Sequence, residues 1–415
     1  MSTQLTADRP ATSTAQPWAL GAPRPSYQLR NVRAVLPDRI LENATLTVRD
    51  GRIQDVTAGG GSAVGAPGAG PVVDGQNLLL VPGFVDVHSD ALENERTPRP
   101  GAEVPIEFAL ASFEGRVAGA GTTTMFHGAA FQHKNTRGVP RSAERALDVC
   151  RVADTTPSYR VDHRVLHRLD VLSADGAEVL RRRVSGLEDG APAPLVSHED
   201  HTPGQGQYAD PAGLRRFMIE RDGLTGEEAD ARIAQRVEEA ADLAAVREAN
   251  LAWLSDLATA GRVRLMGHDP DSPEEIDALV ARGGAVAEFP TTVPAARRAR
   301  ERDLVVVAGA PNVLRGGSHS GNVSARELVS LGLVDALASD YLPTALLASA
   351  ALLAAERVVD LPRAVGLITS GPARVAGLPD RGVIAAGMRA DLALVDDGRG
   401  TWPYAVATLR AEAVS

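Results

Sequence analysis

The chain is poor in the residues that would build a disulfide framework or a membrane anchor. Cys150 is its only cysteine in 415 residues, which excludes an internal disulfide and a metal site made of several thiolates. No apolar run approaches the roughly 20 residues of a membrane span. The N-terminal residues also lack the apolar segment of a signal peptide. We therefore expect a cytoplasmic protein with no membrane contact.

Positive charge is also scarce. The chain has 43 basic and 53 acidic residues, a formal net charge of −10, which argues against binding to nucleic acid or to an anionic membrane surface. An anionic small-molecule substrate would then need a local cluster of positive groups. Residues 1–26, which are rich in Ser, Thr, Ala and Pro, are predicted to form a disordered tail.

Short alternating patterns of apolar and polar residues occupy both ends of the chain. Residues 27–80 contain three such runs, separated by turn signals such as Asp50-Gly51, as expected for strands and hairpins. Residues 382–410 contain two further short strands and a Gly-rich turn. We predict that residues 27–80 and 378–415 pair into one small β domain.

The central part, residues 81–377, alternates short apolar runs with helical patterns, including a long one from Gly226 to Ala260. The strand-like runs are Phe84–His88, Thr122–His127, Arg164–Val171, Pro194–His198, Val263–His268, Ala285–Pro290, Leu304–Ala308 and Val334–Asp340. Strands that alternate with helices in this way predict an α/β fold, and eight of them indicate a (β/α)8 TIM-like barrel.

Residues that could bind metal recur where these strands end. In the stretch VPGFVDVHSD, His88 and Asp90 end the first strand two residues apart, so both side chains point to the same side and can reach one ion. The carboxyl ends of barrel strands carry the active site in this fold. The other strand-end candidates are Asp170, His198, His201, His268, Asp269, Glu288 and Asp340. Their recurrence predicts a metal site, although each alone would be read as an ordinary surface or core residue.

Two loops have compositions that suit substrate binding. SHEDHTPGQGQY, Ser197 to Tyr208, combines His and Asp with a Pro-Gly turn and could close over a site. GAPNVLRGGSHSGN, Gly309 to Asn322, combines Arg315 and His319 with flexible backbone N–H groups, which suits phosphate oxygens. An ordinary surface loop with a salt-bridged arginine is the alternative interpretation of the second loop.

Several segments are together similar to a known enzyme superfamily. VPGFVDVHSD, the Asp of LASD and GLPDRGVIAAGMRADLALVD resemble the amidohydrolase superfamily, in which a metal-dependent (β/α)8 barrel carries a small β-sandwich domain built from both chain ends. Six segments resemble the diphosphatase family of phosphonate catabolism within it: HSDALENERTPRPG, PIEFAL, DHTPGQGQY, AEFPTT, GAPNVLRGGSHSGN and LASDYLP. The resemblance covers nearly the whole chain after about Tyr27. It implies hydrolysis of α-D-ribose 1-methylphosphonate 5-triphosphate to the 5-phosphate and pyrophosphate.

The resemblance also implies a site with two divalent metal ions, for which zinc is the expected ion and manganese or iron are alternatives. His88 and Asp90 would bind the first ion. Asp340 would ligate the same ion and act as the general base that takes the proton of the attacking water. His201 and His268 would bind the second ion.

A carboxylate is then needed to bridge the two ions. Some members of the superfamily use a carbamylated lysine, but the only lysine, Lys134, follows its predicted strand by several residues. We assign the bridge to Asp170, where relatives carry Glu. The residues expected to bind the triphosphate are Arg96, Arg99, Arg315, His319 and Asn322.

Some positions depart from the family pattern. Ala91 stands where relatives carry Asn, and His127 and His198 are additional histidines at strand ends. Two other functions therefore stay open: hydrolysis or deamination of a small C–N substrate such as a cyclic amide, and a metal-free barrel that only binds a ligand. In each case the partner is a small molecule, and the sequence leaves the choice between monomer and homo-oligomer open.

Overall fold

The computed structural model describes residues 25–59, 70–132, 141–158, 160–187, 192–318, 321–398 and 402–411. The predicted tail falls almost entirely outside these ranges, as do Lys134 and His319. Within the same ranges, no helix has both the length and the apolar character that crossing a bilayer demands.

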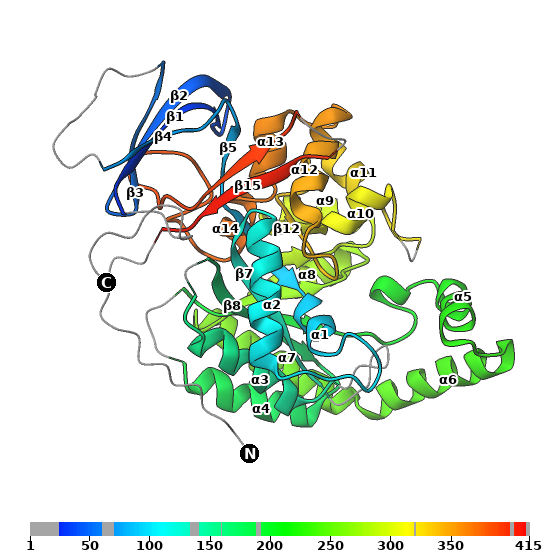
Figure 1. Cartoon of the computed structure of the whole chain (residues 1–415). Coiled ribbons are helices and arrows are strands. Elements are labelled where there is room, and N and C mark those ends of the chain that lie inside the picture. Colours follow the sequence, from blue (N-terminus) through cyan, green and yellow to red (C-terminus); the bar gives the residue numbers. More distant parts are fainter. Residues whose placement is uncertain are drawn as a thin grey trace.

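An eight-stranded parallel sheet forms the centre of the molecule (Figure 1). Its strands, in spatial and chain order, are β6 Phe84–Ser89, β7 Thr122–Phe131, β8 Asp162–Asp170, β9 Leu195–Glu199, β10 Arg264–His268, β11 Val286–Glu288, β12 Val305–Gly309 and β13 Ala336–Ala338. A parallel bridge between Ser89 and Asp340 joins the first strand to the end of the last. Each strand coincides with one of the eight predicted runs, and the predicted barrel is confirmed.

Helices follow most of the barrel strands. They are α1 Ala91–Arg96, α2 Ile106–Gly119, α3 Ala143–Thr155, α4 Ala174–Ser185, α5 Pro211–Asp222, α6 Gly226–Asp242, α7 Ala244–Thr259, α8 Pro273–Ala281, α9 Val293–Glu301, α10 Ala310–Arg315, α11 Ala325–Ser330, α12 Ala345–Ala355, α13 Leu361–Gly366 and α14 Ser370–Val375. The helical pattern from Gly226 to Ala260 is therefore two helices, α6 and α7, which meet at Leu243. Because the barrel strands are covered by helices, most of their residues are buried.

Helices α5 and α6 extend away from the barrel as an arm (Figure 1). Leu214 and Met218 of α5 pack with Ala229 of α6 in a small apolar cluster of their own. A capping box begins α6: the Thr225 hydroxyl accepts from the Glu228 N–H, and the Glu228 carboxylate accepts from the Thr225 N–H. The arm thus has a local core and a defined helix start, although it lies outside the barrel.

Strands from both chain ends form a second, seven-stranded sheet, as predicted. The strands are β1 Tyr27–Val35, β2 Ile40–Arg49, β3 Arg52–Ala58, β4 Val72–Asp74, β5 Leu79–Pro82, β14 Leu392–Asp396 and β15 Tyr404–Leu409. They are ordered β15-β14-β5-β1-β2-β3, with β4 also paired to β1. The C-terminal β14 joins the sheet by antiparallel pairing with β5, and side chains from both chain ends share one apolar core.

An ion-pair cluster fixes the C-terminal segment to the start of the barrel strands. Arg381 Nη1 donates to Asp162 Oδ2 at 2.7 Å and to Thr124 Oγ1 at 2.9 Å, and Arg164 Nε donates to the same Asp162 oxygen at 3.0 Å. Burial opposes ionisation of Asp162, but Arg164 and Arg381 together hold its pKa below the usual value. The folded state therefore binds this proton more weakly than the unfolded chain.

We expect Asp162→Asn to lower the free energy of unfolding by roughly 1–3 kcal/mol at pH 7, a value between those of exposed and buried ion pairs. Because the folded-state pKa is lowered, the contribution is complete above about pH 4 and is lost as the pH falls through that pKa. Urea unfolding at pH 7 and at pH 3 measures both effects. If the free energy of unfolding differs between variant and wild type by the same amount at the two pH values, the stabilisation does not come from the ionised Asp162 carboxylate.

Candidate metal centre and substrate cavity

A cavity of about 940 Å³ opens at the carboxyl ends of the barrel strands. One wall comes from the barrel, and the other from the arm formed by α5 and α6. The sequence-predicted residues that line it are Asp90, Asp170, His201, His268, Arg315, Asn322 and Asp340. Residues that are far apart in the sequence therefore meet in one space because their strands end at the same rim.

His88, Asp90 and Asp340 form a first group of possible ligands, with one ligand atom from each lying within 4.8 Å of the others. His88 Nε2 lies 3.5 Å from Asp90 Oδ1. Backbone hydrogen bonds hold the group together: the Asp340 N–H donates to His88 O at 2.9 Å, and the Asp90 N–H donates to Asp340 O at 2.8 Å. The contacts that close the barrel thus also place the residues of its first and last strands beside one another.

A second group consists of His201, His268 and Asp269, again with ligand atoms within 4.8 Å of one another. His268 Nε2 lies 3.4 Å from Asp269 Oδ2, and the ring centroids of His201 and His268 are 5.7 Å apart. Burial lowers the pKa of His201 to about 4, which keeps this imidazole neutral, the form that binds metal. The strand-end pattern included Asp269 as a candidate, but the resemblance assigned it to neither ion.

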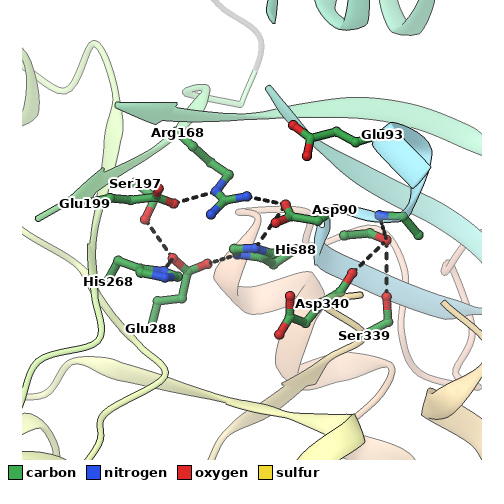
Figure 2. Close-up of polar contacts among 12 residues, drawn as sticks. His88, Asp90, Glu93, Arg168, Ser197, Glu199, His268, Glu288, Ser339 and Asp340 are labelled. Atoms are coloured by element: carbon green, nitrogen blue, oxygen red, sulfur yellow. Dashed lines mark hydrogen bonds and ion pairs between the residues drawn. The ribbon is translucent and has the colours of Figure 1, made fainter. Parts of the chain in front are cut away.

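Glu288, fully buried at the end of β11, connects the two groups and forms a third group of possible ligands with His88 and His268. Its carboxylate accepts hydrogen bonds from His88 Nδ1 at 2.7 Å, His268 Nδ1 at 2.8 Å and Ser197 Oγ at 2.6 Å (Figure 2). Burial alone would raise the pKa of Glu288, but His88 and His268 hold it far below its usual value. The strand-end pattern included Glu288, but nothing in the sequence indicated these hydrogen-bond partners.

Arg168 is a buried cation that sequence reasoning missed. It donates to Asp90 Oδ1 through Nη1 and to Glu199 Oε1 through Nε (Figure 2), and Arg141 Nη2 donates to Asp90 Oδ2 at 3.1 Å. Despite burial, which opposes ionisation, Arg168 holds the pKa of Glu199 at about 2. Strand periodicity could have indicated Arg168, because it lies two residues before Asp170 on β8 and so points to the same side.

Asp170 lines the cavity but does not belong to either group of possible ligands. Its Oδ1 accepts from the Leu172 N–H at 2.9 Å. In the sheet, Asp170 pairs with Glu199 on the neighbouring strand. Two carboxylates therefore lie side by side at the position where a bridge between ions is expected.

The additional histidine of the second strand has a different place. His127 Nε2 lies 2.9 Å from His163 Nδ1, and its ring contacts Phe113 of α2. His163 Nε2 in turn lies 3.0 Å from Glu114 Oε2. These three linked side chains lie between the barrel and α2, and none of them lines the cavity.

Two of the residues predicted to bind substrate lie outside the cavity lining. Arg96 Nε donates to Glu103 Oε1 at 2.7 Å and its Nη2 to Asp148 Oδ2 at 3.0 Å, and it does not line the cavity. Arg99 is exposed and is also outside the cavity lining. Both arginines lie outside the cavity because the segment that follows β6 and α1 is bound to α3, where Arg145 donates to Glu103. The cavity is lined instead by the arm. The prediction for His319 lies outside the described residues.

The arm supplies cationic groups that the sequence did not indicate. Arg232 and Arg236 lie four residues apart on α6, hence on one face of the helix, and both line the cavity. Arg236 Nη2 also donates to the backbone oxygen of His201 at 2.6 Å. The lining thus combines the imidazoles and carboxylates of the strand ends with guanidinium groups from the barrel side, among them Arg168 and Arg315, and from the arm, which also contributes carboxylates.

The donor chemistry of the two groups fits divalent ions. Each offers imidazole nitrogen together with carboxylate oxygen, the set that zinc and related metals accept, and each is partly shielded from water at the bottom of the cavity. Clusters of exposed acidic residues would lack the histidines and the burial. The described residues therefore provide a chemically suitable site for two ions.

Comparison with known proteins agrees with this arrangement. Residues 224–414 match the amidohydrolase family model. The chain is 34% identical over 370 residues, 88% of its length and 94% of the relative, to the α-D-ribose 1-methylphosphonate 5-triphosphate diphosphatase of Escherichia coli (strain K12).

Solved structures share the fold at low identity. An enamidase of the amidohydrolase superfamily superposes with a TM-score of 0.59 at 15% identity, covering 93% of this chain and 94% of that one. The N-acetyl-D-glucosamine-6-phosphate deacetylase of Mycobacterium smegmatis gives 0.52 at 17% identity, covering 93% and 98%. With its barrel, its strand-end ligand groups and these relatives, the chain belongs to the amidohydrolase superfamily, as a member similar to the PhnM diphosphatases.

Proposed function

We propose that the protein is a metal-dependent diphosphatase that hydrolyses α-D-ribose 1-methylphosphonate 5-triphosphate to the 5-phosphate and pyrophosphate. The observation that carries this proposal is the cavity that holds two His–carboxylate groups together with Arg315, which follows a barrel strand, and with Arg232 and Arg236 of the arm. The curated relative that shares 34% identity bears the name of this activity. A cytoplasmic location and a small phosphorylated substrate follow from the same proposal.

In this proposal, two divalent ions are held by the barrel, with zinc expected and manganese or iron as alternatives. His88, Asp90 and Asp340 would hold one ion, His201 and His268 the other, and Asp170 would bridge them. When bound, such ions lower the pKa of a water molecule and neutralise charge on phosphoryl oxygens. The close approach of the ligand atoms within each group supports the assignment.

Asp340 is the proposed general base. Its carboxylate lines the cavity, and burial, together with the nearby charge of Asp90, raises its pKa above the usual value. A carboxylate with a raised pKa is a stronger base and a better proton carrier near neutral pH. In the proposed reaction Asp340 takes the proton of the attacking water and then gives it to the oxygen released from the broken phosphoanhydride bond, so that the 5-phosphate and pyrophosphate are the products.

The arginines have a separate task, which is to hold the triphosphate. Guanidinium groups form paired hydrogen bonds with phosphate oxygens. We expect the double variant R232A/R236A to raise KM by about 10-fold or more with a smaller change in kcat, since each charged hydrogen bond is worth roughly 1.5–3 kcal/mol. Steady-state pyrophosphate release at varied substrate concentration measures this.

Arg99→Ala is the matched control, because Arg99 is exposed and outside the cavity lining. It removes one positive charge at an exposed position and should leave KM unchanged. If R99A raises KM as much as R232A/R236A does, the arm does not bind the triphosphate directly.

A substrate comparison tests the proposed function itself. Pyrophosphate release by the zinc-loaded protein is measured with the ribose methylphosphonate triphosphate and with nucleoside triphosphates. Hydrolysis of dihydroorotate, a cyclic amide, is measured in parallel. Release from the first substrate alone is the expected result. Turnover of the cyclic amide without pyrophosphate release from any triphosphate would replace the proposal by amide hydrolysis.

A further inference from the structure

Glu288 stands out among the buried carboxylates because it contacts one imidazole from each of the two ligand groups. Its Oε1 accepts from His88 Nδ1, and its Oε2 accepts from His268 Nδ1 and from Ser197 Oγ (Figure 2). All three distances are between 2.6 and 2.8 Å, and the residue has no exposed surface. A single side chain is therefore hydrogen-bonded to both halves of the site.

We propose that Glu288 is a positioning residue and not a metal ligand: it holds His88 and His268 with Nδ1 protonated and with Nε2 available to the ions. This inference rests on the proposed two-ion site. The opposite nitrogens support it, since His88 Nε2 faces Asp90 Oδ1 at 3.5 Å and His268 Nε2 faces Asp269 Oδ2 at 3.4 Å. In each imidazole, the nitrogen that faces another ligand is the one that Glu288 does not contact.

The backbone beside Glu288 supports the same role. Phe289 has a φ of 54°, a left-handed conformation that is unfavourable for a bulky side chain and persists only where the surroundings hold it. Its ring centroid lies 5.1 Å from that of His88 and 5.6 Å from that of His268. The strained residue thus packs its ring against the same two imidazoles that Glu288 binds through their edges.

The test is the zinc affinity of Glu288→Gln. A glutamine oxygen can accept from one imidazole, but its amide nitrogen would face the other Nδ1–H, so at least one ring loses its orientation. Outer hydrogen-bond partners of this kind change metal affinity by about 10–100-fold. We expect a loss in this range for at least one of the two ions, measured by competition with a zinc-binding dye and by metal content after dialysis, without substrate.

Glu114→Gln is the matched control, because Glu114 also contacts a buried imidazole, that of His163, but between the barrel and α2. It should bind zinc with wild-type affinity. Wild-type affinity for both ions in E288Q would overturn the proposal.

Nitrogen-15 NMR of the histidines in zinc-loaded wild-type protein provides a second measurement if E288Q does not fold. Protonated Nδ1 and metal-bound Nε2 in His88 and His268 are expected, and metal-bound Nδ1 in either would contradict the positioning role. Both experiments omit substrate, so their results stand even if the protein releases no pyrophosphate from the proposed substrate. Conversely, if Glu288 proves not to position the imidazoles, the proposed diphosphatase activity is still tested by the pyrophosphate assay.

Discussion

Replacing Asp340 by asparagine should reduce kcat by about 10²–10⁴-fold, the range that general acid–base catalysis contributes. Asparagine retains the size of the side chain but cannot accept a proton at neutral pH. It also tolerates the left-handed backbone of this residue, whose φ is 53°. The backbone hydrogen bonds that join residue 340 to His88 and Asp90 are therefore kept, and the fold should be unchanged.

The measurement combines single-turnover pyrophosphate release with circular dichroism and metal content. Asp162→Asn is the matched control, because it makes the same substitution at the opposite end of the barrel strands. It should turn over normally at a temperature where both variants are folded. A D340N protein with near-wild-type kcat would remove Asp340 from the proton transfer, whereas loss of zinc from D340N would show that its main contribution is as a ligand.

The sequence was sufficient for the parts of this molecule that depend on local pattern. Eight apolar runs predicted the barrel strands because buried parallel strands need continuous apolar residues. His88 and Asp90 could be paired from their spacing, since strand geometry alone puts residues two apart on the same side. Asp340 could be placed near them only because the predicted fold is a closed barrel, in which the last strand lies beside the first.

Contacts between residues that are far apart in the sequence could not be predicted. Arg96 follows the first strand, and nothing in its segment indicates that Glu103 and Asp148 hold it away from the cavity. Conversely, Arg232 and Arg236 belong to a helix with an ordinary charged pattern. Their position in the cavity follows from the direction in which the arm leaves the barrel, and that direction is set by packing between distant elements.

The assignment of the bridging carboxylate leads to the second large effect. Asp170 and Glu199 end adjacent strands and are paired in the sheet register. Asp170 lines the cavity, whereas Glu199 is buried and its Oε1 accepts from Arg168. Because Asp170 lines the cavity and Glu199 does not, Asp170 is kept as the proposed bridge.

We therefore expect Asp170→Asn to lower bound zinc from about two equivalents to one, with a fall in kcat of about 100-fold or more, because a two-ion site stabilises the attacking and leaving oxygens together. The backbone turn should survive, since an asparagine oxygen can still accept from the Leu172 N–H. Zinc content by mass spectrometry after dialysis, measured beside pyrophosphate release, gives both numbers.

Glu199→Gln makes the same charge change on the neighbouring strand and should retain both equivalents of zinc. If E199Q loses an ion and D170N does not, the bridge belongs to Glu199, and Arg168 must then release it when the ions bind. That outcome carries a further requirement, because Arg168 also donates to Asp90. Arg168 binds the two carboxylates through separate nitrogens, whereas a lysine offers a single ammonium group. In that case Arg168→Lys, made in the otherwise wild-type protein, should release Glu199 more readily and strengthen zinc binding.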